Sequence, residues 1–143
     1  APRLLEHRLR EVDEVGNWRS VVTPSGRRAC TEVLGVAHLF APDGSPASLA
    51  HLRLHTGRRH QIRAHLAHEG HPLVGDEGAY GADRPPAAWC PRIFLHACRL
   101  GIDVGDGPID VGLPLPRDLA TALAALDPAD ECATRFRRRW LGG

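Results

Sequence analysis

The stretch TGRRHQIRAHLAHEGHPLVGD, residues 56–76, decides how the fold of this chain is interpreted. Thr56-Gly57 interrupts an alternating segment that comes before it, and glycine is a common place for a strand to end. Residues 60–69 then have helical spacing, with Ile62 and Leu66 one turn apart. The stretch therefore predicts a strand, a bend and a short helix in immediate succession.

The residues before this bend predict a pair of strands. Thr31–Phe40 has the composition of a strand, and Pro42-Asp43-Gly44 is a turn signal that ends it. Ser48–His55 alternates between apolar and polar residues, as a strand with two different faces does. We expect these two strands to form a hairpin across the turn. Upstream, Trp18–Val22 has the pattern of a short strand, and the remainder of residues 1–30 has no clear assignment.

The residues after the bend predict the end of the helix, a loop and further strands. Gly70 is a typical C-terminal stop for a helix, and the histidine-proline pair that follows cannot easily continue it. Residues 77–91 are rich in glycine and proline and predict a loop. The segments expected to be strands are Ile93–Ala97, Arg99–Val104 and Ile109–Leu113. A tight glycine turn joins the last two of them.

The C-terminal residues predict two helices. The leucines of residues 119–126 recur at i, i+4 and i+7, the spacing of one helical face. We expect a second helix to start with Asp127 as its N-cap and Pro128 as its first residue. The arginines of residues 135–139 fall toward the end of this helix, where positive charge suits the helix dipole.

Length and composition bound the class of protein. The chain has 143 residues, of which 43% are hydrophobic and 24% are charged, as is typical of one soluble globular domain. It has no apolar stretch of roughly 18 residues, so we expect no membrane span. A net charge of +1 gives no overall signal for nucleic-acid binding, so any basic surface must be local. With the expected elements, this predicts an α+β fold with helices packed on a mixed or antiparallel sheet.

The cysteines and histidines lack the spacing of a metal site. Cys30, Cys90, Cys98 and Cys132 are widely separated and form no CxxC pair, so we expect reduced and mostly buried thiols. The histidines around the predicted helix do not repeat at the spacing of zinc ligands on one helical face. We therefore expect no bound metal.

Arginines crowd around the predicted bend. Arg53, Arg58, Arg59 and Arg63 lie in or beside it, against one acidic residue, Glu69. A guanidinium group binds a carboxylate or a phosphate through two hydrogen bonds, and a strand that turns directly into a helix presents such groups rigidly. The bend is thus predicted to bind an anion. The alternative is a solvated basic face without a ligand.

These residues resemble the signature of a known family. Residues 56–76 closely resemble the motif TGRTHQIRxHLxxxGHPxxGD of the RluA-like RNA pseudouridine synthases, with one clear departure at Arg59, where that family usually has threonine or serine. Arg92–Ala97 is similar to the family's R-L-x-L-H-A segment, and Leu113–Leu119 to its proline-rich stretch before a helix. The resemblance is clearest over residues 18–126 and follows the family's order.

The resemblance implies an enzyme that converts uridine to pseudouridine in tRNA or rRNA, without a metal or an organic cofactor. In this family an aspartate attacks, the C1′–N1 bond breaks and the uracil is rejoined through C5. Arg58 matches the arginine that pairs with this aspartate, and a nearby cation favours the ionised carboxylate that attack requires. The expected RNA contacts are Arg53, Arg59, His60, Gln61 and Arg63. Structural roles are expected for Thr56, Gly57, Gly70, His71, Pro72, Gly75, Asp76 and His96.

The family's nucleophile has no counterpart in this sequence. The family's aspartate lies in a G-R-L-D-xx-T-S-G segment upstream of the matched region, and Asp13, Asp43 and Asp103 lack that context. Asp76 belongs to a motif that is thought of as structural. Methionine is absent, so an upstream region is expected. We therefore expect residues 1–143 to be the C-terminal part of one synthase-like domain, with an incomplete sheet that exposes an edge and apolar surface, and to be inactive alone.

Several interpretations stay open on the sequence alone. Instead of an isomerase with its nucleophile upstream, the chain could be a non-catalytic RNA-binding module derived from the family, or a structural domain without salt-sensitive RNA affinity. His60 and Gln61 fit a structural role as well as an RNA contact, and His96 fits packing within a strand. Residues 127–143 are expected to form a helical, arginine-rich extension, either solvated or in auxiliary contact with RNA. The sequence does not specify the RNA, the uridine or the compartment.

Overall fold

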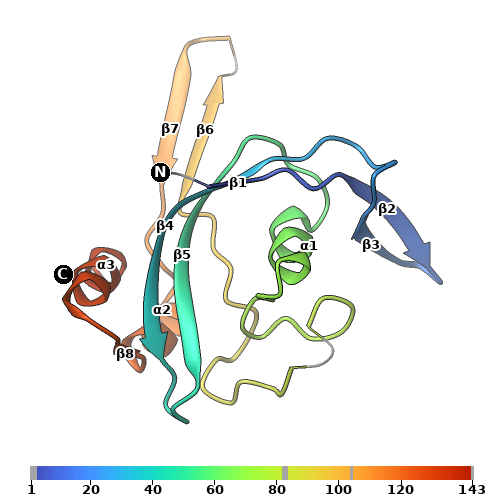
Figure 1. Cartoon of the computed structure of the whole chain (residues 1–143). Coiled ribbons are helices and arrows are strands. Elements are labelled where there is room, and N and C mark those ends of the chain that lie inside the picture. The colour runs from blue at the N-terminus through green and yellow to red at the C-terminus, as the bar shows by residue number, and fades with distance from the viewer. Residues whose placement is uncertain (1–2, 82–83, 104, 143) are drawn as a thin grey trace.

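The fold is α+β, as predicted, and the pairings between the described strands are antiparallel. Figure 1 shows the computed structural model, which describes residues 3–81, 84–103 and 105–142. In chain order its elements are β1 (Arg3–Leu5), β2 (Leu9–Glu14), β3 (Asn17–Val22), β4 (Thr31–Phe40), β5 (Pro46–Leu54), α1 (Gln61–His68), β6 (Arg99–Asp103), β7 (Pro108–Gly112), α2 (Arg117–Ala124), β8 (Asp127–Pro128) and α3 (Glu131–Trp140).

Strand β4 is the centre of the main sheet. It pairs with β5 along its length, so the predicted hairpin across residues 42–44 is confirmed. Its other edge is shared by β1, which pairs near the start of β4, and β8, which pairs near its end. The register shifts between Val33 and Gly35, and a Cβ atom at Gly35 would lie 2.8 Å from the ring of Phe136. The absence of a side chain at this bulge therefore lets α3 lie close to the sheet.

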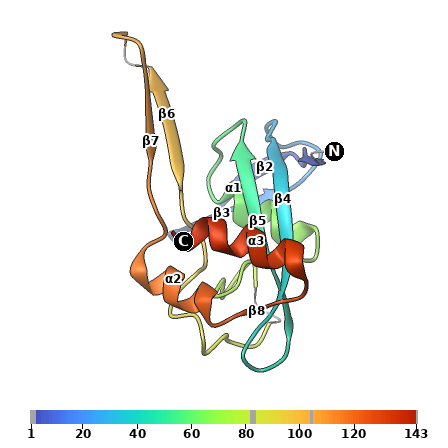
Figure 2. The same ribbon diagram turned by 90° about the vertical axis from the view of Figure 1, so that its left-hand side faces the viewer.

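Helices cover the two faces of the main sheet unequally. Figures 1 and 2 show α1 on one side of β4 and β5, and α3 on the other. The larger core lies on the α3 side, where Ala37 and Leu39 of β4 contact Leu123, Leu126 and Ala133. A smaller core contains Ala64 of α1 with Leu9 and Ala29. The leucine spacing that predicted α2 is thus the spacing of a buried face.

Two hairpins extend away from the main sheet, as Figures 1 and 2 show. The first, β2–β3, pairs from Leu9 opposite Val22 to Glu14 opposite Asn17. The second, β6–β7, is exposed along both strands, including its large apolar side chains. Exposed apolar surface was expected of an incomplete sheet, and part of it lies on this hairpin.

Two segments differ from the prediction. Residues 93–97 do not form a strand, because their backbone contacts are isolated: the Phe94 N–H donates to Val74 O at 2.8 Å, and the Leu95 N–H turns back to Ile93 O. The second C-terminal helix does not start at Asp127. Asp127 and Pro128 pair with the edge of β4 instead, and Asp130 is the N-cap of α3, its side chain accepting from the Ala133 N–H at 2.7 Å.

The thiols are less buried than expected. Only Cys90 is buried among the four free cysteines, and Cys132 is exposed. Trp89 and Trp140 pack against the core, whereas Trp18 on the β2–β3 hairpin is largely exposed. None of the described helices has the length and apolar character that crossing a membrane requires.

Candidate functional site

The bend before α1 has a left-handed backbone at one residue. His60 has φ 50° and ψ 29°, and α1 begins directly after it at Gln61. Histidine is one of the few residue types that adopt this conformation without large strain. The helix ends as predicted at Gly70, which has φ 84°, with the His71 N–H donating to Leu66 O at 2.8 Å. This is the glycine-terminated helix end that the sequence indicated.

Gln61 connects the bend to the sheet. Its side chain is 3% exposed. Its Oε1 accepts from the Thr56 hydroxyl at 2.7 Å and from the Arg58 N–H at 3.1 Å. Its Nε2 donates to Cys30 O and to Thr31 Oγ1, both at 3.0 Å. The expected RNA contact at Gln61 does not fit this arrangement, because both polar atoms of its buried amide have protein partners. Gln61 instead holds the backbone of Arg58 in place.

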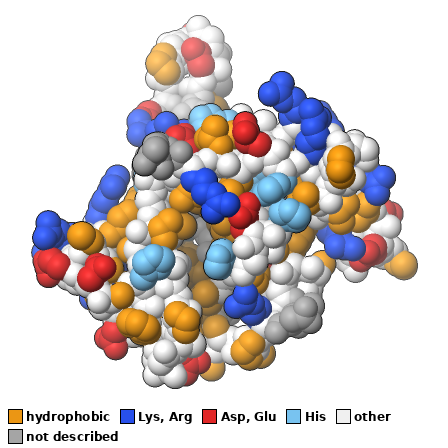
Figure 3. Space-filling view, in the orientation of Figure 1, with side chains coloured by type: hydrophobic (Ala, Val, Ile, Leu, Met, Phe, Trp, Pro, Cys, Tyr) orange, Lys and Arg blue, Asp and Glu red, His pale blue; other side chains and the backbone are white. Residues whose placement is uncertain are grey.

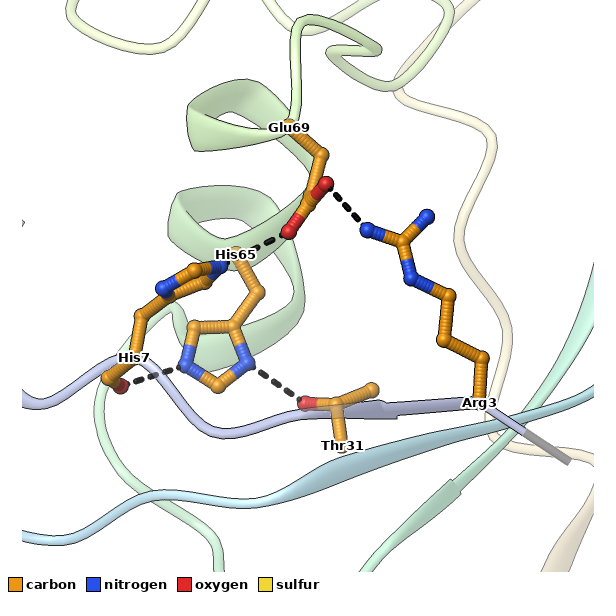
Figure 4. Close-up of polar contacts among 5 residues, drawn as sticks. All are labelled: Arg3, His7, Thr31, His65 and Glu69. Carbon is orange, nitrogen blue, oxygen red and sulfur yellow. Dashed lines mark hydrogen bonds and ion pairs between the residues drawn. The ribbon is translucent and has the colours of Figure 1, made fainter.

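The network continues through His65, as Figure 4 shows. The His65 side chain is fully buried, with Nδ1 2.9 Å from Thr31 Oγ1 and Nε2 2.8 Å from the carbonyl oxygen of His7. A carbonyl can only accept, so Nε2 carries the proton and the Thr31 hydroxyl donates to Nδ1. Burial lowers the pKa of His65, which agrees with a neutral ring.

An ion pair closes the outer end of this network. Glu69 accepts from Nε2 of His7 at 2.7 Å and from Arg3 at 2.6 Å (Figure 4). The hydrogen bond with His7 lowers the pKa of Glu69, with the Arg3 contact adding to the effect. The polar contacts of α1 therefore bind the segment between β1 and β2 to the helix. Because Gln61 bonds Thr31, and Thr31 bonds His65, the bend and this segment form one structural unit.

Arg58 lies at the wall of a pocket. Its Nε donates to the carbonyl oxygen of Arg28 at 3.0 Å, which fixes the inner edge of the guanidinium. Among the described residues, neither of its Nη atoms has a hydrogen-bond partner. The pocket has a volume of about 280 Å³ and is lined by Leu9, Arg10, Glu11, Ser20, Ser25, Gly26, Arg27 and Arg58. Arg58 is thus anchored at one nitrogen and open at the other two, beside a cavity that could receive an anion.

Arg63 is directed to the protein interior and not to the pocket. It forms two hydrogen bonds with the buried carboxylate of Asp76, at 2.8 and 3.1 Å, and these raise the pKa of Arg63. Its guanidinium also lies 4.7 Å from the centre of the Tyr80 ring. The expected RNA contact at Arg63 fits poorly, because a phosphate would have to displace Asp76. The Asp76 carboxylate binds Arg63 within the fold, which is compatible with the structural role expected of its motif.

The hydroxyl of Tyr80 joins the bend to the β2–β3 hairpin. It hydrogen-bonds Nδ1 of His60 at 3.1 Å and accepts from the Ser20 N–H at 2.8 Å. The hydroxyl of Ser20 in turn donates to the carbonyl oxygen of Arg59. Burial lowers the pKa of His60. His60 is therefore tied to Tyr80, and its ring is only partly available to a ligand.

The other two predicted RNA-binding arginines, Arg59 and Arg53, lie at different places. Arg59 is exposed and faces Glu11 at 3.4 Å. Arg53 lies on the same face of β5 as His51, and the His51 ring contacts Trp140 of α3. Arg53 is therefore on the α3 side of the sheet, away from the pocket beside Arg58. The structure brings Arg58 and Arg59 to one end of the molecule and leaves Arg53 apart from them.

The remaining motif residues support local turns. Thr56 Oγ1 accepts from the Cys30 N–H at 2.9 Å, directly before Gly57. Gly75 has φ 79°, and a Cβ atom there would lie 2.5 Å from the carbonyl oxygen of Arg92. His96 is 3.1 Å from the carbonyl oxygen of Leu113, which connects the segment before β6 to the end of β7. His71 is exposed and Pro72 half-buried after the helix end.

Sequence reasoning missed the residues that complete the pocket and the network. Arg10 and Arg27 line the pocket, and His7 bonds both His65 and Glu69. All three lie in residues 1–30, which had no clear assignment. The pair Arg27-Arg28 after a Pro-Ser-Gly turn was the available signal. Among the described residues, no three His, Cys, Asp or Glu side chains are grouped as ligands of one metal ion.

Comparisons with known proteins point in one direction. No family model matches the chain. Ribosomal large subunit pseudouridine synthase D of Haemophilus influenzae is 40% identical over 132 residues, which covers 75% of this chain and 40% of that protein. An uncharacterized RNA pseudouridine synthase of Chloroflexus aurantiacus is 41% identical over 110 residues, which covers 76% of this chain and 33% of that protein. The solved structure of human RNA pseudouridylate synthase domain containing 1 matches 96% of this chain and 59% of that chain, with a TM-score of 0.68 and 26% identity. The chain thus spans well under half the length of these two curated relatives.

Proposed function

Because the chain belongs to the RluA-like family of RNA pseudouridine synthases, we propose that it forms part of the active site of an enzyme that isomerises uridine to pseudouridine in RNA. The names of the relatives from Haemophilus favour ribosomal RNA of the large subunit as the substrate. The target base has to leave its stack before it can react, as it does in other enzymes that modify bases. Like the activity, this choice of RNA is a proposal for the whole protein.

The position of Arg58 carries the proposal. Its guanidinium is held by Arg28 O at 3.0 Å, its backbone is held by Gln61 at 3.1 Å, and it lines a pocket. In the proposed enzyme, Arg58 pairs with an ionised aspartate that lies outside these 143 residues. A cation beside a carboxylate lowers the pKa of the carboxylate, which keeps it ionised for attack on the nucleotide.

Tritium release from RNA that contains 5-tritiated uridine tests this role. The hydrogen at C5 is lost when C5 becomes bonded to C1′, so release reports isomerisation. In the full-length protein, Arg58→Ala should slow release by about two to three orders of magnitude, as the loss of a preorganised electrostatic partner does. Arg117→Ala is the matched control, since Arg117 is exposed on α2 and does not line the pocket. A rate close to that of the wild type in the Arg58→Ala protein would refute the role of Arg58.

The alternative function is a non-catalytic RNA-binding module of the same family. It is favoured by one observation, the exposed arginines that line the pocket beside Arg58, because such a surface can bind RNA without reacting with it. It predicts RNA affinity that weakens as salt rises, with no tritium release by the full-length protein. Release above background by the full-length protein would exclude it.

A further inference from the structure

We propose that Arg10 and Arg27 form a binding site for a phosphodiester of the RNA backbone, in the pocket that they share with Arg58. This inference rests on the proposed function for the identity of the ligand. It assigns different tasks to the three arginines of the pocket: Arg58 faces the reacting nucleotide, and the other two hold the strand beside it. Neither Arg10 nor Arg27 belongs to the signature stretch.

The wall of the pocket is rigid. The turn of residues 23–26 is closed against β2 by three backbone hydrogen bonds, from Thr23 N–H to Arg8 O at 3.0 Å, from Leu9 N–H to Arg27 O at 3.0 Å, and from Arg27 N–H to Leu9 O at 2.7 Å. A Cβ atom at Gly26 would lie 2.6 Å from the carbonyl carbon of Leu9, so only glycine lets the turn approach this closely. The backbone that carries Arg10 and Arg27 is therefore fixed before any ligand arrives.

The charge of the pocket is positive and unneutralised. Arg10, Arg27 and Arg58 line it against one acid, Glu11, which itself faces Arg59 at 3.4 Å. Within the described residues, the side chains of Arg10 and Arg27 make no hydrogen bond or ion pair, and both are exposed. Several other arginines face carboxylates, as in the pairs Arg63–Asp76, Arg92–Asp118 and Arg99–Asp110. Three arginines without a carboxylate partner among the described residues therefore line this pocket.

The location suits a polyanion better than a small ligand. Figure 3 shows a group of arginine side chains toward the upper right of the molecule, near the β2–β3 hairpin. The Arg8 guanidinium donates to the carbonyl oxygen of Gly26 in the pocket wall, and the backbone of Arg28 accepts from Arg58 Nε. An RNA strand that extends from the pocket would bring further phosphates to these neighbours. Phosphate contacts of this kind position RNA without reading its sequence.

Salt-dependent RNA binding by the full-length protein tests the proposal. The probe is a fluorescent single-stranded RNA that contains uridine, followed by anisotropy at several salt concentrations. Removal of both side chains, in Arg10→Ala with Arg27→Ala, should weaken binding about tenfold for each arginine. It should also reduce the slope of log affinity against log salt by about 1.4. Arg10→Lys with Arg27→Lys should keep the slope, because the charges remain.

The matched control removes the same charge elsewhere. Arg99→Ala with Arg117→Ala changes two exposed arginines on β6 and α2, neither of which lines the pocket. This control should leave affinity within about twofold of the wild type, as expected for a surface without specific contacts. An equal loss in the control, or an unchanged salt slope in the Arg10 and Arg27 variant, would overturn the proposal.

The two proposals fail separately. If the wild-type protein releases no tritium but the Arg10 and Arg27 variant still loses affinity and salt slope, the phosphate site stands and the isomerase does not. If tritium is released and the variant binds RNA as the wild type does, the isomerase stands and the phosphate site does not. If the Arg10 and Arg27 variant has an altered unfolding midpoint but an unchanged salt slope, the pocket would bind an acidic side chain of the protein itself and not an RNA phosphate.

Discussion

The α1 region and the β6–β7 hairpin differ in whether their side chains have partners within the chain. Around α1, the buried polar atoms of Gln61, Thr31 and His65 are bonded within the chain. On the hairpin, Leu100 pairs with Val111 and Ile102 with Ile109, which places all four apolar side chains on one exposed face. The α1 region is thus complete in its own contacts. The hairpin exposes an apolar surface of the kind that usually packs against another protein.

The largest effect is expected where the buried network would be broken. Gln61→Leu leaves the carbonyl oxygen of Cys30, the Arg58 N–H and the Thr56 hydroxyl without their buried partner. The free energy of unfolding should fall by about 2–4 kcal/mol, because buried polar groups without partners are costly. Unfolding in denaturant measures this loss.

A polar residue on the sheet surface serves as the control for Gln61. Ser48 is exposed on β5 and bonds His38 at 3.0 Å. Ser48→Ala should change the free energy of unfolding by less than about 0.5 kcal/mol. If Gln61→Leu cost no more than Ser48→Ala, the α1 network would not be the stabilising unit that its geometry indicates.

An intermediate effect is expected from pH. Burial lowers the pKa of His65 below its ordinary value, so the unfolded chain takes up a proton there at a higher pH than the folded chain does. The stability from neutral His65 is full above about pH 6.5 and is lost as the pH falls toward the lowered pKa. The slope reaches at most about 1.4 kcal/mol per pH unit. Glu69, whose pKa is also lowered, adds a separate loss below about pH 4.5.

Unfolding midpoints between pH 8 and pH 5.5 test the role of His65. The charged or titratable groups around it are His7, His68 and Glu69. His65→Gln should reduce the pH dependence in this range, and Asn17→Ala, which changes an exposed residue that does not titrate, should not. Burial lowers the pKa of His51 and His60 as well, so part of the dependence should remain. An unchanged slope in His65→Gln would show that His65 is not the main titrating group.

The smallest effect on stability is expected on the hairpin. Ile102 and Ile109 are 45% and 49% exposed, so threonine at both positions removes few contacts and keeps a β-branched side chain. The free energy of unfolding should change by less than about 0.5 kcal/mol. In sedimentation experiments on the 143-residue chain, the variant with both threonines should self-associate less than the wild-type sequence. A loss above about 1 kcal/mol would mean that the apolar face packs within the chain.

Elements with a local signal could be predicted from the sequence. The turn at residues 42–44 lies between two alternating runs, and it joins β4 to β5 as expected. The leucine spacing that predicted α2 reflects burial of Leu119 and Leu123. Gly70 ends α1 because its left-handed backbone suits glycine. In each case neighbouring residues contain the physical cause of the structure.

Elements that lack their usual local signal, or that depend on distant contacts, could not be predicted. The β2–β3 hairpin turns at Val15 and Gly16, with φ 53° and 85°, and valine is an unusual residue for the first of these positions. The usual Asn-Gly signal was therefore absent. Asp127 and Pro128 have the sequence of a helix start, but they pair with the edge of β4 and so belong to the sheet. The pocket was missed for the same reason, because Arg10 and Arg27 meet Arg58 only after folding.

Tyr80 is the single tyrosine of the chain, and it lies where the bend, the β2–β3 hairpin and Arg63 meet. Isotopic labelling of tyrosine would therefore give one set of ring signals in a magnetic resonance spectrum, and these signals would come from the candidate site. Its hydroxyl touches His60, and its ring lies beneath a guanidinium group. The native sequence thus contains an internal probe for ligand titrations, without any substitution or attached dye.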